Sequence, residues 1–467
     1  MKPRSEGADK LRSLPPMDGL LQSPGAERFF SLLGRTTVKD ILSEVLSDLR
    51  RDLLNGAEIS PTAEKVLERA LPVLEKRCRR SLLSVVNATG VVVHTNLGRS
   101  CLAPEAVQAV AEAASGYSTL EFDLDGGKRG HRSDHVEWLL CRATGAEAGI
   151  AVNNNAGAVL LMLAALCAER EVVVSRGELV EIGGSFRIPD IMAFSGARLR
   201  EVGATNRTHR ADYEGGIGEE TAALLKVHPS NFRMEGFTSS VPREDLAALA
   251  RERGILFLED LGSGTLLDLS PLGLRGEPTV ADCIREGVDL VTFSGDKMLG
   301  GPQIGAIVGK KALVDRLRTY PLLRALRVDK MTLAAFEATL RLYLSGRTEE
   351  IPTLAMISAS KDALRKKAKG LAEKLKKILP GEKITLVEVD DAVGGGAFPA
   401  TPLPGWGVAL PGERWGSAGN LLALLRGQEN PVIAGARENE AIFHVRTLLG
   451  GDEERICRSL RAVSEKG

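Results

Sequence analysis

A lysine stands in this chain where imine chemistry needs one. In DLVTFSGDKMLGGPQIGAIVG an apolar run ends at Phe293, Ser294 and Lys297 follow at Ser-x-x-Lys spacing, and a glycine-rich turn leads into a second apolar run. A lysine at the carboxyl end of a sheet strand lies where α/β proteins bind ligands. An imine-forming amine needs a lowered pKa beside a cofactor's ring and phosphate. We therefore expect Lys297 to form a Schiff base and Ser294 to reach the phosphate.

The Ser-x-x-Lys spacing alone is weak, because penicillin-binding proteins use it too, so the prediction depends on further features. LFLEDLGSG places Asp260 at the end of another apolar run, ahead of Lys297 in the chain. A carboxylate there would keep a pyridine nitrogen protonated and preserve the electron sink of the ring. Glu259 would point to the opposite face of the same strand, so Asp260 is the expected partner.

A phosphate cradle is the third requirement. The run GIAVN leads into Asn154, Asn155 and Ala156 and then into a helical pattern. The first N–H groups of a helix bind anions through unsatisfied donors and the helix dipole. Simple N-capping by asparagine is the alternative explanation. The three features occur in the correct chain order, and together they predict an enzyme that uses pyridoxal 5′-phosphate (PLP).

Several histidines are further candidates. KVHPSNFRMEGF places His228, Ser230 and Asn231 at a strand end, where side chains would face the cofactor. His94 and His131 lie in polar segments and are candidates only, because a single loop histidine is more often structural or solvated than catalytic.

Three arginines could bind an oxyanion. Arg99 follows VVVHTNLG, whereas Arg324 and Arg327 lie one helical turn apart in PLLRALRVDK. Guanidinium groups on one helix face are usually solvated or paired. If these two converge with Arg99, they make an oxyanion or phosphate clamp.

These residues need an α/β framework to position them. Short β-branched runs alternate with amphipathic segments from about residue 85 to 310, as in a mainly parallel sheet covered on both faces. The expected strands cover 91–97, 149–153, 171–175, 199–203, 223–228, 255–260, 289–294 and 305–310. We predict three domains: a helical N-terminal domain at 1–80, a large cofactor-binding domain at 81–320 and a small α+β domain at 321–467. The last should contain a hairpin that turns around Arg437–Asn439.

Composition excludes several classes of protein. In 467 residues, Lys+Arg and Asp+Glu balance at 61 each, so net charge does not favour a nucleic-acid partner. The six cysteines form no C-x-x-C pair, which argues against a zinc site or a disulfide framework. Neither a secretory signal nor a membrane-length apolar run is visible. We therefore expect a cytoplasmic enzyme without a membrane partner.

The motifs together resemble bacterial selenocysteine synthase, the L-seryl-tRNA(Sec) selenium transferase family, from about residue 15 to the C-terminus. The segments that resemble it are VNATGVVVHTNLGRS, EFDLDGGKRGHR, VNNNAGAV, GSFRIPDIM, VGATNRT, KVHPSNFRMEGF, LEDLGSG, FSGDKMLGGPQ and LRVDKMTLAAFEATLRLY. The resemblance implies a fold-type-I, aspartate-aminotransferase-like PLP enzyme. Its partners would be seryl-tRNA(Sec), gripped by the N-terminal domain, and selenophosphate. The assembly would be a homodecamer, a pentamer of dimers.

The resemblance also assigns residues and a route. The cofactor lysine falls on Lys297, the oxyanion-binding arginines on Arg99, Arg324 and Arg327, and Asp296 belongs to the same site. The serine amine would form an external aldimine, β-elimination of water would leave an aminoacrylyl intermediate, and selenium would add to it.

Two rivals remain. A related PLP-dependent lyase acting on a small amino substrate would share Lys297, Asp260 and the asparagine cradle, but would need neither the helical N-terminal domain nor the full arginine set. A non-enzymatic tRNA-binding protein would need none of the cofactor residues.

Overall fold

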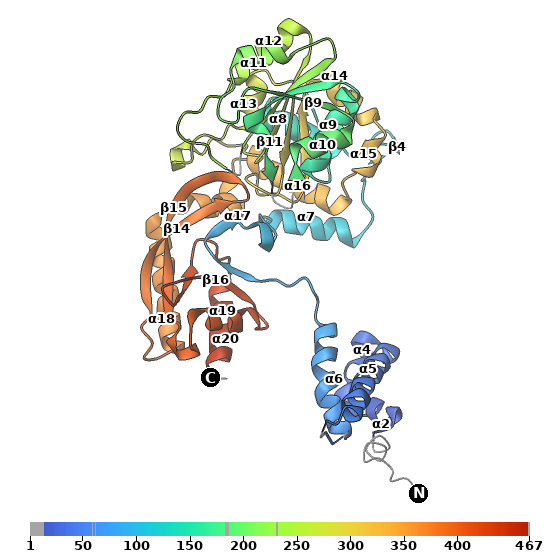
Figure 1. Ribbon diagram of the computed structural model, residues 1–467, viewed down its shortest axis with the longest axis vertical. Helices are drawn as coiled ribbons and strands as arrows, with labels where there is room; N and C mark the ends of the chain where they lie inside the picture. Colours follow the sequence, from blue (N-terminus) through green and yellow to red (C-terminus); the bar gives the residue numbers. More distant parts are fainter. Residues whose placement is uncertain (1–13, 58, 61, 183–185, 230–231, 466–467) are drawn as a thin grey trace. The chain divides into compact units, whose positions relative to one another are not determined.

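The computed structural model describes residues 14–57, 59–60, 62–182, 186–229 and 232–465. The chain forms two compact units, one ending at Ser84 and the other comprising Val85–Gly467 (Figure 1). Each has its own hydrophobic core. Among the described residues, no helix is both long enough and apolar enough to cross a bilayer.

The N-terminal unit is helical. Its helices are α2 (Met17–Leu21), α3 (Pro24–Glu27), α4 (Phe30–Leu33), α5 (Arg35–Leu54) and α6 (Ala63–Cys78). Apolar residues recur three and four apart in α5, so that Leu42, Leu46 and Leu49 lie on one buried face. The unit is therefore closed around a core of its own.

The larger unit is built around a seven-stranded sheet with the order β5-β13-β12-β11-β10-β6-β9. The strands are β5 (Ala148–Val152), β13 (Gly305–Gly309), β12 (Leu290–Ser294), β11 (Leu256–Gly262), β10 (Thr221–Val227), β6 (Glu171–Ser175) and β9 (Arg198–Val202). Among the described strands of this sheet, only β13 runs antiparallel to its neighbours. The carboxyl ends of the others therefore meet at one edge, together with the start of β13.

Helices cover both faces of this sheet. One face packs against α9 (Asn155–Cys167), α10 (Ile188–Ser195) and α14 (Lys311–Thr319). The other packs against α8 (Asp134–Thr144), α12 (Arg243–Arg253), α13 (Val280–Arg285) and α16 (Lys330–Leu344). Burial on both faces explains why β10, β12 and β13 are buried at every position. Helix α16, which follows the predicted domain boundary at 320, belongs to the core of the large sheet.

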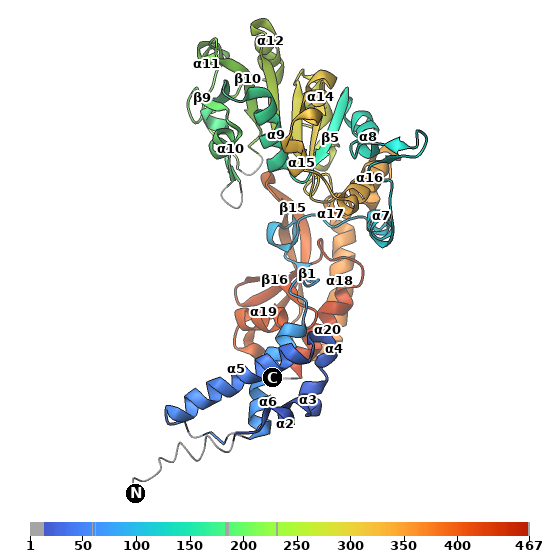
Figure 2. The same ribbon diagram turned by 90° about the vertical axis from the view of Figure 1, so that its right-hand side faces the viewer.

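A second sheet, of six strands, has the order β1-β16-β17-β15-β14-β2. Its strands are β1 (Val86–Ala88), β16 (Val432–Arg437), β17 (Glu440–His444), β15 (Ala397–Pro411), β14 (Thr385–Gly394) and β2 (Val91–Val93). Helices α18 (Lys361–Ile378), α19 (Ala418–Arg426) and α20 (Asp452–Ser464) complete its core. Figure 2 shows β15 extending from this small sheet toward the large one.

The remaining elements connect these layers. They are α7 (Pro104–Ser115), β3 (Phe122–Asp123), β4 (Lys128–Arg129), β7 (Glu181–Ile182), β8 (Phe186–Arg187), α11 (Arg210–Gly216), α15 (Leu322–Ala325) and α17 (Pro352–Ser358). The predicted hairpin is confirmed: Arg437 pairs with Glu440, and Glu438 and Asn439 turn with positive φ.

One strand prediction was wrong. The run 91–97 forms a strand only at Val91–Val93 and then a 3-10 turn at Thr95–Leu97. This strand pairs with β14 in the small sheet rather than with the large one. Its β-branched residues indicated a strand correctly, but nothing local to them indicated which sheet it would join.

Candidate active site

Lys297 lies just beyond the end of β12, and its side chain is buried at 6% exposure. Burial lowers its pKa, and the charge of Arg99 lowers it further, whereas Asp260, Asp296 and Glu277 oppose the shift. The turn is held by backbone bonds from Met298 N to Ser263 O (3.1 Å) and from Gly300 N to Lys297 O (3.1 Å). The result is a lysine amine more easily deprotonated than one in water.

The Asp260 side chain lies on the face of the seven-stranded sheet that α9 covers. Its Oδ1 accepts a hydrogen bond from Asn155 Nδ2 at 2.8 Å and one from Thr292 Oγ1 at 3.3 Å. Complete burial raises the carboxyl pKa, while the Asn155 bond and the Lys297 charge favour the ionised form. Pairing with a protonated ring nitrogen would stabilise the ionised carboxylate in this environment.

Glu259 points to the other face, as predicted. Both of its carboxylate oxygens accept hydrogen bonds from Arg243 at 2.7 Å. It is therefore already paired, and Asp260 is the available carboxylate.

The N-terminus of α9 lies against the start of β13. Asn154 caps the helix by accepting from Gly157 N at 2.8 Å. Asn155 Oδ1 is buried and has no partner among the described residues. A Cβ on Gly305 would come within 2.2 Å of Asn154 O, so this close approach requires glycine. The free N–H groups at the start of α9 fit a bound phosphate. The buried Asn155 Oδ1 is an acceptor and fits a hydrogen-bond donor rather than the phosphate.

Ser294 is brought to this cradle by strand register. It pairs with Gly305, which in turn pairs with Val152 immediately before the asparagine run. Thr292, Ser294 and Asp260 thus share the α9 side of the edge with Asn155.

Arg99 meets the lysine loop directly. Its guanidinium contacts Asp296 at 2.7 Å, and Ser100 N donates to Asp296 O at 3.2 Å. Arg99 itself has a left-handed backbone, with φ of 63°. The structure therefore brings Arg99 and Asp296 beside Lys297, and their roles there stay a prediction.

Arg324 and Arg327 line a pocket of about 710 Å³. Lys297, Arg99 and Asp296 are not part of its lining. Arg327 pairs with Glu121 rather than with any group around Lys297. Its backbone is nevertheless anchored beside the cradle, through a bridge to Val152 and a bond from Asn153 N to Leu326 O at 3.0 Å. The pocket, called the arginine pocket below, is lined by five arginines, at positions 129, 132, 318, 324 and 327. Among the described residues, no hydrogen bond or ion pair joins Arg324 or Arg327 to Arg99, so their convergence stays a prediction.

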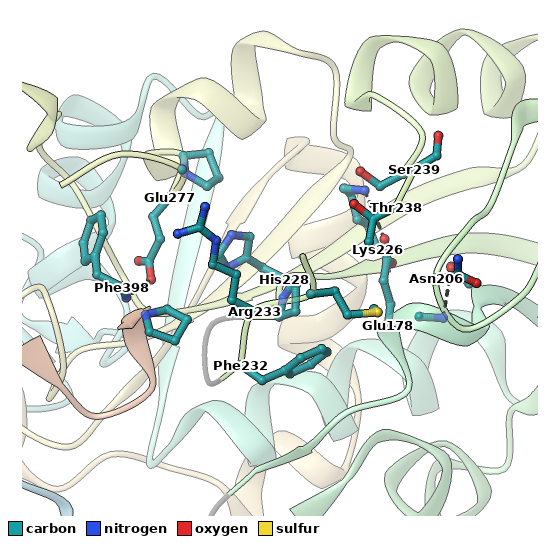
Figure 3. Close-up of a pocket in the computed structure, with 18 of the residues that line it drawn as sticks. Glu178, Asn206, Lys226, His228, Phe232, Arg233, Thr238, Ser239, Glu277 and Phe398 are labelled. Carbon is teal, nitrogen blue, oxygen red and sulfur yellow. Dashed lines mark hydrogen bonds and ion pairs between the residues drawn. The ribbon is translucent and has the colours of Figure 1, made fainter. Parts of the chain in front are cut away.

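His228 lies at the end of β10, in a separate cavity of about 870 Å³ (Figure 3). Burial lowers its pKa to about 4, and the charges that act on it come from Glu259, Arg243 and Lys226. Its Nδ1 is buried without a partner among the described residues. These charges lie on the face opposite Asp260, so a cofactor contact for His228 stays a prediction.

The other candidates can be placed in part. His94 Nδ1 is buried without a partner among the described residues, whereas His131 lines the arginine pocket. Ser230 and Asn231 lie outside the described residues.

Two carboxylates were missed from the sequence. Glu277 accepts from Phe398 N at 2.7 Å, at the tip of the β14–β15 hairpin, and its charge acts on Lys297. Glu121 binds three arginines of the arginine pocket. Neither stands at a strand end of the large sheet, which is the feature that marks Asp260 and Ser294 in the sequence.

Three features define a PLP-dependent enzyme of fold type I. They are the strand order of the large sheet, its single antiparallel strand and the buried lysine after β12. Among solved structures, the fold is similar to D-glucosaminate-6-phosphate ammonia-lyase, with a TM-score of 0.59 at 22% identity over 84% of this chain and 98% of that chain.

Sequence comparisons identify the family. The profile of the L-seryl-tRNA selenium transferase family matches residues 85–449, and that of the selenocysteine synthase N-terminal region matches residues 11–50. L-seryl-tRNA(Sec) selenium transferase of Nitratidesulfovibrio vulgaris is 53% identical, covering 84% of this chain and 86% of the relative. That of Moorella thermoacetica is 48% identical over 97% of both. The chain belongs to the L-seryl-tRNA selenium transferase family, and its cofactor is PLP.

Proposed function

We propose that this enzyme converts L-seryl-tRNA(Sec) to L-selenocysteinyl-tRNA(Sec), with selenophosphate as the selenium donor. The main support is the 48% identity to a transferase of that name over 97% of both chains. The buried Lys297, with Asp260 and the asparagine cradle beside it, supplies the residues that such a reaction requires.

Lys297 has two roles in this proposal. Bound PLP supplies an imine linkage and an electron sink for charge developing at the serine α-carbon. Lys297 Nζ would hold the cofactor between turnovers and, as a free amine when substrate is bound, would remove the α-proton. Its lowered pKa leaves more of the amine unprotonated, as a base requires. Asp260 keeps a proton on the ring nitrogen, and Asn155 Nδ2 orients that carboxylate.

The cofactor's other contacts follow from the edge of the sheet. We assign the phosphate to the start of α9, where Asn154, Asn155 and Ala156 present backbone N–H groups, and to the Ser294 hydroxyl. His228, neutral at physiological pH because burial depresses its pKa to about 4, is the remaining proposed contact.

The donor's oxyanion is assigned to arginines. Arg99, Arg324 and Arg327 offer planar forks that match tetrahedral oxyanions. Asp296 fixes Arg99 at 2.7 Å and so orients it toward the lysine.

We further propose that the helical N-terminal domain, predicted at 1–80, grips the tRNA, and that the small domain begins after α16 rather than at the predicted residue 320. Family resemblance supports a cytoplasmic homodecamer, a pentamer of dimers. The match of a separate profile to residues 11–50 supports a distinct role for the N-terminal domain.

The test is an absorption spectrum of the purified holoenzyme, before and after seryl-tRNA(Sec) and then selenophosphate. We expect an imine band that shifts with the charged tRNA, followed by selenocysteinyl-tRNA(Sec) on addition of the donor. A band that ignores seryl-tRNA(Sec) but responds to a small amine would transfer the function to the lyase rival. Absence of any imine band would favour a non-enzymatic tRNA-binding protein.

A further inference from the structure

Glu121 lies among the arginines of the arginine pocket. Its Oε2 accepts from Arg129 at 2.7 Å and its Oε1 from Arg132 Nε at 2.8 Å. Arg327, one of the proposed oxyanion-binding residues, also pairs with Oε1. One carboxylate is thus shared by three guanidinium groups.

The pocket holds more positive than negative charge. Its lining contains five arginines, against Glu121 and Asp315 as the carboxylates. Arg318 contacts Glu137 at 2.5 Å, and its Nε is buried without a partner among the described residues. Glu121 therefore supplies most of the negative charge that its three partners contact.

Glu121 is ionised under ordinary conditions. Burial opposes its ionisation, but the hydrogen bond from Arg132 and the charges of Arg327 and Arg129 lower its pKa overall. The side chain is 23% exposed, so that it is accessible enough to be displaced.

A carboxylate and a tetrahedral oxyanion use the same guanidinium donors. An incoming oxyanion cannot engage Arg327 fully while Glu121 occupies those donors. The backbone segment that carries Arg327 adjoins the cofactor cradle through the bond from Asn153 N to Leu326 O.

We propose that Glu121 is a built-in counter-anion of the arginine pocket, which holds the oxyanion subsite closed to weakly bound anions and re-enters it when the product phosphate leaves. This inference rests on the proposed function, in which selenophosphate gives up selenium and leaves inorganic phosphate. Without Glu121, the uncompensated arginines would retain phosphate. The residue is thus a positioning and specificity determinant rather than a catalytic group.

The test compares phosphate binding by wild-type holoenzyme and by Glu121→Gln, using calorimetry with inorganic phosphate. Glutamine keeps the size of the side chain and removes its charge. We expect the variant to bind phosphate about tenfold more tightly, because a competing charge has been removed. Phosphate should also inhibit its turnover at correspondingly lower concentration. Glu121→Asp, which keeps the carboxylate, should stay near the wild-type affinity.

A matched control is Glu337→Gln on α16. Glu337 pairs with Arg341 at 2.7 Å outside the arginine pocket, so its loss removes one carboxylate from an arginine without altering the pocket. Unchanged phosphate affinity in a folded Glu121→Gln enzyme would overturn the proposal, as would equal tightening in Glu337→Gln. Calorimetry needs neither tRNA nor selenium. Failure to make selenocysteinyl-tRNA(Sec) would instead contradict the proposed function.

Discussion

At the scale of single residues, Lys297 gives the most direct test of the cofactor assignment. Lys297→Ala removes the amine that forms the imine, so we expect the absorbance band to disappear. The fold should persist, because the residue lies in a loop whose backbone bonds, from Met298 N to Ser263 O and from Gly300 N to Lys297 O, remain available. Absorption and circular dichroism spectra measure the two effects separately. A variant that kept an imine band near the wild-type wavelength would show that another lysine holds the cofactor.

His228 makes a prediction about stability and pH. Its folded pKa of about 4 lies below the ordinary value of 6.5, so the unfolded chain binds more protons between these values. Stability is therefore fully present above pH 6.5 and is lost as pH falls toward 4. From pH 7 to pH 5 this residue should cost about 2 kcal/mol of unfolding free energy.

The measurement is urea unfolding at both pH values, compared with His228→Gln. The glutamine variant should lose less stability than wild type over the same interval, since it has no imidazole to protonate. Equal losses in the two proteins would mean that His228 titrates normally.

At the scale of elements, the junction of α9 with β13 positions the phosphate cradle. Gly305→Ala would place a Cβ about 2.2 Å from Asn154 O, a backbone atom that cannot rotate away. The start of α9 must then shift, and we expect a loss of about 1–3 kcal/mol in stability and roughly tenfold weaker retention of PLP.

Release of PLP during dialysis, followed by absorbance, measures this effect. Gly370→Ala is the control, because an added Cβ there meets nothing within 4 Å on helix α18. It should retain PLP as wild type does. Normal retention in Gly305→Ala would show that the helix start does not hold the phosphate.

The elements also show where sequence reasoning succeeds. Strand ends at Asp260 and Ser294, and the helix start at Asn155, could be predicted because parallel strands bring their carboxyl ends to one edge. The role of Glu121 could not be predicted, because it depends on contact with Arg327, which is distant in the sequence. Val91–Val93 was assigned to the wrong sheet for the same reason: strand pairing is non-local.

At the scale of the whole molecule, separate cores imply separable functions. The N-terminal unit, ending at Ser84, buries its own residues. A unit of this size has a small free energy of unfolding. It can therefore lose its structure while the core around the seven-stranded sheet, which holds Lys297, remains intact.

Leu42→Ala tests this independence in the full chain. Leu42 is fully buried in α5, so its truncation should cost about 2–5 kcal/mol and unfold much of the N-terminal unit. We expect the imine band to be unchanged, while the KM for seryl-tRNA(Sec) rises at least about tenfold because the proposed tRNA grip is lost. Leu54→Ala, the same change at a position 68% exposed on the same helix, should alter neither. If Leu42→Ala abolished the band as well, the two units would depend on each other for folding; if it left the KM unchanged, the tRNA would be held elsewhere.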